Sequence, residues 1–209
     1  MFKKKSIICL AGGPSQLKLL KKLKQEKYFI FLVDRNDNCV GKKYSDIFIH
    51  CSTLDYQKII LKLKKFQKEF EFFAIFNQSS GLPVLTACYL CEKFKIGYLK
   101  FNKAKNILFK SSLLKMCKEK KILIPNIIDK KNMKPSEKLY ILKPSFTHKG
   151  KVNTIKTSFN GISKKIQSVK KNSLDKKVII QEYIDGFDIT VYGFVKNFKI
   201  KILSIFQEE

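Results

Sequence analysis

The sequence predicts an α/β protein with two different halves: a Rossmann-like parallel sheet first and an α+β domain after it. In the first hundred residues, short apolar runs alternate with segments whose apolar residues have helical spacing, and the connecting loops are short. This alternation is typical of a parallel sheet with helical crossovers. In the second half, apolar runs mostly follow one another, and the last two are separated by a tight turn. We therefore expect a domain boundary near residue 105.

The first half contains four apolar runs that we expect to form the strands of the parallel sheet: 6–10, 29–33, 47–49 and 72–76. Three segments with apolar residues at helical spacing are expected to form its helices: 16–24, 56–70 and about 83–94. Residues 52–55 resemble a capping box before the second of these helices. In such a sheet, a binding site is expected at the carboxyl ends of the strands.

The second half predicts two helices and a series of strands. We expect helices over 106–120 and within 158–171. The runs expected to be strands are 139–142, 152–155 and 177–181, followed by a hairpin of 189–195 and 198–205. The predicted organisation is thus a parallel-sheet domain over 1–105, an α+β subdomain over 106–182, and the start of a last subdomain over 183–209.

The formal net charge of +26 is high enough to suggest nucleic-acid binding. All but one of the 43 basic residues are Lys, however, and Arg35 is the exception. Nucleic-acid readers favour Arg, whose planar guanidinium pairs with phosphate and with guanine, and the lysines here are spread over every segment. We therefore do not expect nucleic acid as a partner. A Lys-rich polyanion binder stays an alternative.

The six cysteines do not form a framework of disulfide pairs or metal ligands. Cys88 and Cys91 are spaced as C-x-x-C, but they fall in a predicted helix and no second pair completes a zinc site. We expect free, buried thiols in a reducing cytoplasm. The apolar run after the N-terminal lysines is too short for a signal peptide, and no stretch approaches the roughly 18 apolar residues of a membrane span. The sequence predicts a cytoplasmic protein with no membrane segment.

A lysine follows the apolar run 139–142 directly. Lys143 must either reach solvent or lie where an anion offsets its loss of hydration. The polar loop after it contains Ser145, His148, Lys149 and Gly150 and leads into the next run. A lysine at a strand end followed by a loop with further lysines suits a flap over phosphate groups. The alternative is an ordinary edge hairpin.

A second constellation lies at 181–188, where an apolar run gives way to polar side chains, crosses Gly186 and re-enters a strand beyond Asp188. In such a crossing, backbone groups can read the edge of a base, and a nearby carboxylate can accept hydrogen bonds from ribose hydroxyls. The alternative is a plain hinge with solvated acidic residues.

Together these segments resemble the ATP-grasp superfamily, nearest to the carboxylate–amine ligases and to the large-subunit type of carbamoyl-phosphate synthase, over essentially the whole chain. Residues 121–125 stand for the family's G-I-P-x-P segment, Lys143-Pro144 for its V-x-K-P strand, and 181–188 for its E-x-x-I-x-G-x-E hinge. The resemblance implies that 181–184 line the adenine through backbone groups and that Asp188 holds the ribose. The ATP-binding residues it implies are Lys110, Lys143, Ser145, His148, Lys149, Gly150, Gln181, Glu182, Tyr183, Ile184 and Asp188.

The chain departs from the family pattern at several of these positions. Gln181 stands where the family usually has Glu, and Asp188 where it has a longer Glu. The segment 121–125 lacks the glycine and the first proline, and the flap carries Phe146 and His148 where relatives are rich in Gly and Ser. These changes leave the fold prediction intact and bear on the tightness of ATP binding.

In the first domain, Gly12-Gly13 and the residues after them also resemble the family, in which this domain contributes to the acceptor-substrate side. The two glycines could open a helix that binds an anion. Alternatively they serve only a tight turn.

The resemblance implies an enzyme that activates a small carboxylate as an acyl phosphate with ATP and Mg²⁺, for attack by an amine or similar nucleophile. The family's metal ligands, an acidic residue and an E-x-N pair, lie on later strands, so we expect the Mg²⁺ ligands beyond residue 209. No catalytic residue is identified in the sequence. The chain is thus the ATP-binding portion of such a ligase or, alternatively, an inactive nucleotide- or ligand-binding module. A homodimer is a possible assembly.

Overall fold

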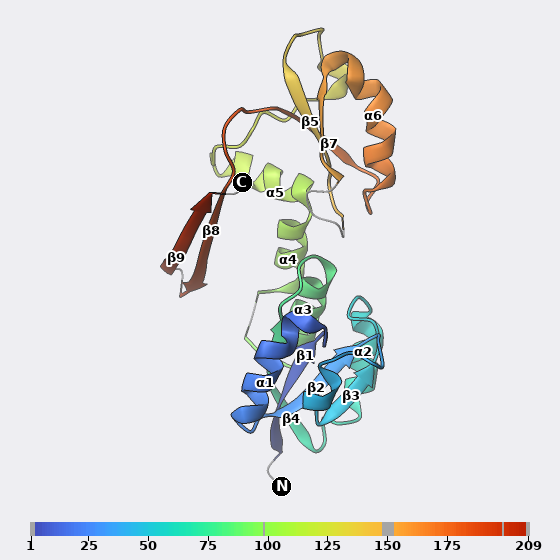
Figure 1. Ribbon diagram of the computed structural model, residues 1–209, viewed down its shortest axis with the longest axis vertical. Coiled ribbons are helices and arrows are strands. Elements are labelled where there is room, and N and C mark those ends of the chain that lie inside the picture. Colours follow the sequence, from blue (N-terminus) through green and yellow to red (C-terminus); the bar gives the residue numbers. More distant parts are fainter. Residues whose placement is uncertain (1–2, 98, 148–152, 198, 208–209) are drawn as a thin grey trace.

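A computed structural model describes residues 3–97, 99–147, 153–197 and 199–207. The chain forms an elongated molecule with a parallel sheet at one end and an antiparallel sheet at the other (Figure 1). Helices α4 and α5 lie between the two sheets, and a separate hairpin projects to one side.

The first half folds as a four-stranded parallel sheet in the order β3-β2-β1-β4. Its strands are β1 (Lys4–Leu10), β2 (Phe29–Asp34), β3 (Ile47–His50) and β4 (Phe70–Asn77). Its helices are α1 (Leu17–Gln25), α2 (Tyr56–Lys64) and α3 (Leu82–Lys93), with short 3-10 turns η1 (Pro14–Gln16) and η2 (Lys42–Tyr44). The predicted parallel α/β architecture is confirmed.

Strand β1 is buried on both faces because it lies inside the sheet with helices on either side. Ile8 and Leu10 belong to one apolar cluster, which includes residues of α2 and α3. Ile7 and Cys9 belong to the other, which includes Leu20 of α1. Successive residues of a strand point to opposite faces, so a continuous apolar run supplies both layers of the core.

Helices α4 (Phe101–Leu108) and α5 (Lys110–Glu119) replace the single helix predicted over 106–120. The helix is interrupted at Phe109, whose dihedral angles are extended. The ring of Phe109 packs on that of Phe146, with centroids 4.5 Å apart. Helix α4 packs on α3, since Ala104 shares a buried cluster with Leu85 and Cys88. The predicted boundary at residue 105 therefore falls inside a helix that contacts the first domain.

The second half contains an antiparallel sheet in the order β6-β5-β7. Its elements are β5 (Leu139–Pro144), β6 (Ile155–Ser158), α6 (Phe159–Lys171) and β7 (Val178–Glu182), preceded by the 3-10 turn η3 (Lys130–Asn132). Helix α6 covers one face, where Tyr140 and Leu142 pack against Ile162 and Val169. Strand β6 begins at Ile155, the last residue of the strand predicted at 152–155.

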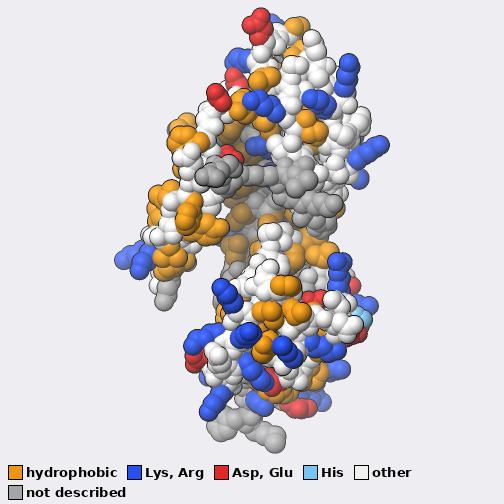
Figure 2. All heavy atoms as spheres, viewed as in Figure 1, with side chains coloured by type: hydrophobic (Ala, Val, Ile, Leu, Met, Phe, Trp, Pro, Cys, Tyr) orange, Lys and Arg blue, Asp and Glu red, His pale blue; other side chains and the backbone are white. Residues whose placement is uncertain are grey.

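The last two strands, β8 (Ile189–Lys196) and β9 (Lys199–Gln207), pair only with each other among the described residues. Many large apolar side chains of this hairpin are exposed, and they form the apolar cluster on the projecting arm in Figure 2. They are Ile189, Val191, Tyr192, Phe194, Val195, Ile200, Ile202, Leu203, Ile205 and Phe206. Within the described residues, no helix combines the length and the apolar character that crossing a bilayer requires.

Candidate functional site

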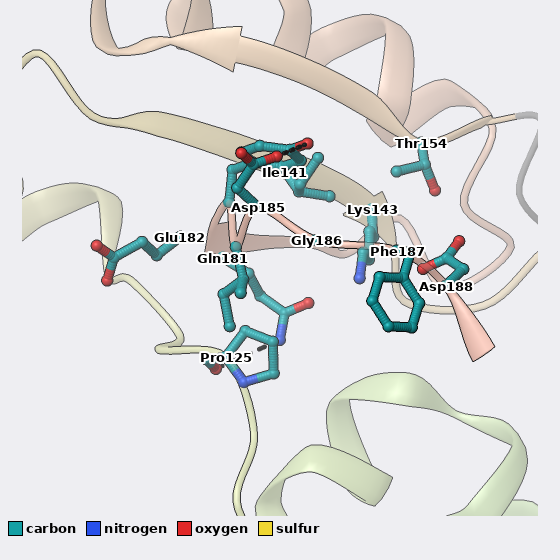
Figure 3. Close-up of a pocket in the computed structure, with 12 residues that line it drawn as sticks. Pro125, Ile141, Lys143, Thr154, Gln181, Glu182, Asp185, Gly186, Phe187 and Asp188 are labelled. Carbon is teal, nitrogen blue, oxygen red and sulfur yellow. Dashed lines mark hydrogen bonds between the residues drawn. The ribbon is translucent and has the colours of Figure 1, made fainter. Parts of the chain in front are cut away.

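A cavity of about 470 Å³ lies against the face of the β5–β7 sheet that α6 leaves uncovered (Figure 3). The sheet supplies its floor, and the segment that leaves β7 supplies a wall. Its lining residues are Pro125, Ile141, Lys143, Thr154, Gln181, Glu182, Tyr183, Ile184, Asp185, Gly186, Phe187 and Asp188. A volume of this size is typical of small-molecule sites in proteins.

Strand alternation selects the side chains that face the cavity. In β5, Tyr140 and Leu142 point into the core beneath α6, so Ile141 and Lys143 point the other way. The antiparallel register places Ile141 opposite Gln181 of β7, and both line the cavity. Strands β5 and β7 therefore present one lysine and one amide to the same space.

Lys143 is a cation held in a partly dehydrated place. Burial lowers the pKa of Lys143 below its ordinary value, and the charge of Lys110 lowers it further, while Asp188 acts in the opposite direction. Lys110 begins helix α5, whose first turn is tied to the end of β5 by a hydrogen bond from the Lys110 N–H to the Ser145 carbonyl at 2.9 Å. Lys143 thus carries a positive charge into the cavity, with the charge of Lys110 acting on it, which favours an anionic ligand there.

Gln181 lines the cavity from β7, opposite Ile141, and is only 3% exposed. Its side-chain Nε2 donates to the Pro125 carbonyl at 3.4 Å, close to the outer limit for a hydrogen bond. In Figure 3 the side-chain oxygen points into the open space on the Lys143 side. The amide is thus held by one weak contact and faces whatever occupies the cavity.

Glu182 lines the cavity, but its carboxylate turns away from it (Figure 3). Oε1 accepts from Lys138 Nζ at 2.6 Å and Oε2 accepts from Asn126 Nδ2 at 3.2 Å. The hydrogen bond from Lys138, with support from Asn126, holds the pKa of Glu182 below its ordinary value. This side chain joins β7 to neighbouring segments and leaves only main-chain atoms for a ligand.

Backbone groups become available where β7 ends. The N–H groups of Glu182 and Tyr183 donate to the carbonyls of Asn126 and Leu139, at 3.1 and 2.9 Å. Among the described residues, no backbone hydrogen bond involves residues 184–187. Unpaired N–H and C=O groups beside a cavity are suited to bind a ligand with donors and acceptors of its own.

Tyr183, a predicted site residue in the cavity wall, contacts Lys156, which the sequence did not single out. Lys156 of β6 lies opposite Ile141 in the sheet, and its Nζ is 3.4 Å from the centroid of the Tyr183 ring. The Tyr183 hydroxyl donates to Asp185 Oδ1 at 3.2 Å. The position of Lys156 follows from the pairing of β6 with β5, and one lysine among so many gave no separate signal in the sequence.

The predicted site residues are only partly brought together. Lys143, Gln181, Glu182, Tyr183, Ile184 and Asp188 line the cavity, and Lys110 acts on it through its charge. Ser145 is fully buried and donates to Ser111 Oγ at 2.8 Å, so the structure places it behind the cavity, between β5 and α5. His148, Lys149 and Gly150 lie outside the described residues. Thr154, Phe187, Ile141 and Pro125 line the cavity without having been predicted.

The described residues do not provide a metal site. No group of three or more His, Cys, Asp or Glu side chains among them could hold an ion. In the cavity, Glu182 is paired with Lys138 and Asp185 accepts from Tyr183. A Mg²⁺ ion prefers several oxygen ligands in octahedral geometry, and this donor set does not fit that requirement.

The glycine turn of the first domain has a steric role at Gly12. Its N–H donates to Asp34 Oδ2 at 2.7 Å, and its carbonyl accepts from the Gly41 N–H at 2.8 Å. A Cβ atom on Gly12 would lie 2.8 Å from the Cys39 sulfur and 2.9 Å from Leu32 Cδ2. A side chain at this position would therefore have to displace Cys39 and Leu32, which glycine avoids.

Comparison with known proteins relates part of this chain to a known family. A family model described as an ATP-grasp domain matches residues 109–208. Among curated protein sequences, none matches this chain closely enough to count as a relative.

Several solved structures are similar in fold. The structure of N5-carboxyaminoimidazole synthetase from Staphylococcus aureus complexed with ADP has a TM-score of 0.74 at 13% identity, covering 100% of this chain and 57% of that one. L-amino acid ligase from Bacillus licheniformis has a TM-score of 0.68 at 10% identity, covering 99% and 51%. D-Alanine-D-alanine ligase from Helicobacter pylori has a TM-score of 0.60 at 12% identity, covering 98% and 71%.

The chain spans little more than half the length of the first of these structures. The similarity extends over both halves of the chain, the parallel sheet as well as the antiparallel one. Residues 109–208 match the model of the ATP-grasp domain, and in this chain they follow a parallel-sheet domain.

Proposed function

We propose that the cavity on the β5–β7 sheet binds ATP, and that the chain is the ATP-binding portion of a ligase. The observation that carries the proposal is Lys143, a half-buried cation that faces the cavity beside a second lysine. A desolvated ammonium group is costly unless an anion accompanies it. A triphosphate would supply that anion, and Lys110 and Lys143 would hold it.

The remainder of the nucleotide would lie along the wall that leaves β7. The backbone groups of 184–187 would bind the edge of the base, and Asp188 would accept hydrogen bonds from the ribose hydroxyls. Asp188 lies close enough to Lys143 to act on its charge, which suits a sugar placed next to the phosphates. The loop with His148, Lys149 and Gly150 would cover the phosphates.

The reaction we infer is carboxylate activation. A carboxylate oxygen attacks the γ-phosphorus of ATP and ADP leaves; an amine then attacks the carbonyl carbon of the acyl phosphate, and inorganic phosphate leaves. The similarity to ligases supports this chemistry. We assign no step to a metal ion, because the described residues do not form a metal site. The first domain would contribute to the binding site of the acceptor substrate. The whole chain would act in the cytoplasm.

A second candidate is a nucleotide-binding module without turnover. The observation that favours it is the ion pair of Glu182 with Lys138, which turns this cavity carboxylate away from a phosphoryl-transfer metal. The two candidates share the nucleotide site and differ only in whether γ-phosphate is released.

Calorimetric titration with ATP, ADP and CTP tests the proposed site. We expect ATP and ADP to bind and CTP to bind more weakly, because a purine and a pyrimidine present different edges to 184–187. Absence of binding by all three would refute the site. Single-turnover release of ADP, with Mg²⁺ and candidate amino acids, then separates the ligase from the inactive module; a Lys143→Ala variant sets the background.

A further inference from the structure

We propose that Gln181 makes this site accept purine nucleotides with either an amino or an oxo group at position 6 of the base. The inference rests on the proposed function, since it assigns a role within the same nucleotide site. It concerns the class of nucleotide that the site takes.

The position of Gln181 follows from the sheet. Its partner across the sheet is Ile141, and both side chains leave the sheet on the cavity side. The residue is 3% exposed, so its amide meets the protein and the content of the cavity and almost nothing else. Lys143 lies two residues further along β5 than Ile141, on the side of Phe187 and Asp188 in Figure 3, which favours the phosphates there and the base beside Gln181.

The amide of Gln181 keeps both kinds of hydrogen-bonding group for a ligand. One N–H of Nε2 is directed at the Pro125 carbonyl, 3.4 Å away, and the second N–H is not used in any described hydrogen bond. Among the described residues, the side-chain oxygen accepts no hydrogen bond, and Figure 3 shows it facing the cavity. A glutamine amide has two donors and a two-lone-pair acceptor, so the oxygen and one donor remain for the base.

The group at position 6 of a purine is a hydrogen-bond donor in some bases and an acceptor in others. The 6-amino group of adenine is a donor, which the Gln181 oxygen can accept. The 6-oxo group of hypoxanthine or guanine is an acceptor, which the free N–H of Gln181 can satisfy. An ionised carboxylate at this place would accept only and would face a 6-oxo group as one acceptor against another. A buried polar group left unpaired weakens binding strongly.

The adjacent backbone does not impose one choice. Residues 184–187 offer N–H donors and C=O acceptors side by side, and none of these groups is held in a described backbone hydrogen bond. Gly186 has a φ of 146°, a conformation that few other residues adopt, in the middle of this segment. A base can therefore bind either a backbone donor or a backbone acceptor here. The choice between 6-amino and 6-oxo purines then depends on the buried side chain of Gln181.

The test is titration of ATP and inosine triphosphate, which differ only at position 6 and in the N1 proton that accompanies the change. For the unchanged chain we expect dissociation constants within about tenfold of each other. For Gln181→Glu, measured at pH 8 so that the carboxylate is ionised, we expect the ratio to move at least about tenfold in favour of ATP. Lys143→Ala, as a control, should weaken both nucleotides and leave their ratio unchanged.

Two results would overturn the inference: a more than hundredfold preference of the unchanged chain for ATP, or a Gln181→Glu variant that keeps the original ratio. If Gln181→Glu does not fold, as judged by thermal unfolding, Gln181→Met replaces it and should weaken both nucleotides equally. An ATP-specific loss in Gln181→Met would contradict a shared role. Failure of both nucleotides to bind refutes the proposed function as well, whereas binding of ATP alone refutes this inference only.

Discussion

The positive charge of Lys110, at the start of helix α5, lowers the pKa of Lys143 on strand β5, adding to the effect of burial. Like charges in a partly buried place repel, and burial adds to the cost. The backbones of the two elements are connected here, because the Lys110 N–H donates to the Ser145 carbonyl directly after β5. An anion between the two side chains would offset the repulsion. The two lysines together therefore indicate an anion-binding site more strongly than either lysine alone.

Removal of the Lys143 ammonium group should weaken nucleotide binding. We expect Lys143→Ala to reduce the affinity for ATP by about 1.5–3 kcal/mol, because a charged hydrogen-bond partner of a phosphate is lost. Lys164→Ala is the matched control, since Lys164 is exposed on helix α6 of the same subdomain. Calorimetric titration measures both variants. Equal losses at the two positions would remove the phosphate-binding interpretation of Lys143.

The lowered pKa of Lys143 predicts how ATP binding depends on pH. In the free protein this lysine loses its proton at a lower pH than an ordinary lysine, whereas bound phosphate favours the charged form. Affinity should therefore be full below the lowered pKa and fall as the pH rises through it. Lys143→Arg keeps its charge over this range and should show a flatter profile. Titrations between about pH 7 and pH 10 give the comparison; identical profiles would mean that another group titrates.

Asp188 should contribute to binding of the nucleoside rather than of the phosphates. We expect Asp188→Asn to weaken ATP and adenosine by the same factor, because a ribose contact is present in both. Competition titrations with the two ligands give the factors. A loss confined to ATP would place Asp188 beside the phosphates, where Lys143 already lies within its influence.

The parallel sheet and the cavity-facing lysine could be predicted from sequence because both depend on local periodicity. The run before Lys143 alternates between core and cavity, which fixes the direction of Lys143. The pairing of β5 with β7 then places Gln181 on the same side. The break at Phe109 could not be predicted, since it accompanies a ring contact with Phe146, far along the chain. The pairing of Glu182 with Lys138 is of the same kind, because it depends on which strands become neighbours.

The close contact at Gly12 predicts a loss of stability on substitution. A Cβ atom there would overlap Cys39 and Leu32, both of which are buried. We expect Gly12→Ala to lower the free energy of unfolding by about 1–3 kcal/mol, the usual cost of overpacking a core. Gly97→Ala is the control, since nothing lies within 4 Å of an added Cβ at that position. Urea unfolding measures both, and an unaffected Gly12→Ala variant would show that the turn has room.

The cysteines should react with alkylating reagents according to their burial. Burial raises the pKa of Cys9 to about 12 and that of Cys91 to about 11, so neither forms the reactive thiolate at neutral pH. Cys117 is the one cysteine that is not buried. We expect iodoacetamide to modify Cys117 first in the folded chain and all six cysteines in urea, as measured by peptide mass spectrometry. Rapid labelling of Cys9 in the folded chain would contradict the packing of β1.

The β8–β9 hairpin should exchange its amide protons with solvent faster than the parallel sheet does. Its ladder is flanked by exposed apolar side chains and no described strand covers either edge, and isolated two-stranded hairpins are only marginally stable in water. Its amide protons should therefore exchange with deuterium through frequent local opening, while those of β1 and β2 should exchange only on global unfolding. A molecule that packs on the hairpin would slow the exchange of its amide protons. The exchange rates in the parallel sheet would not change.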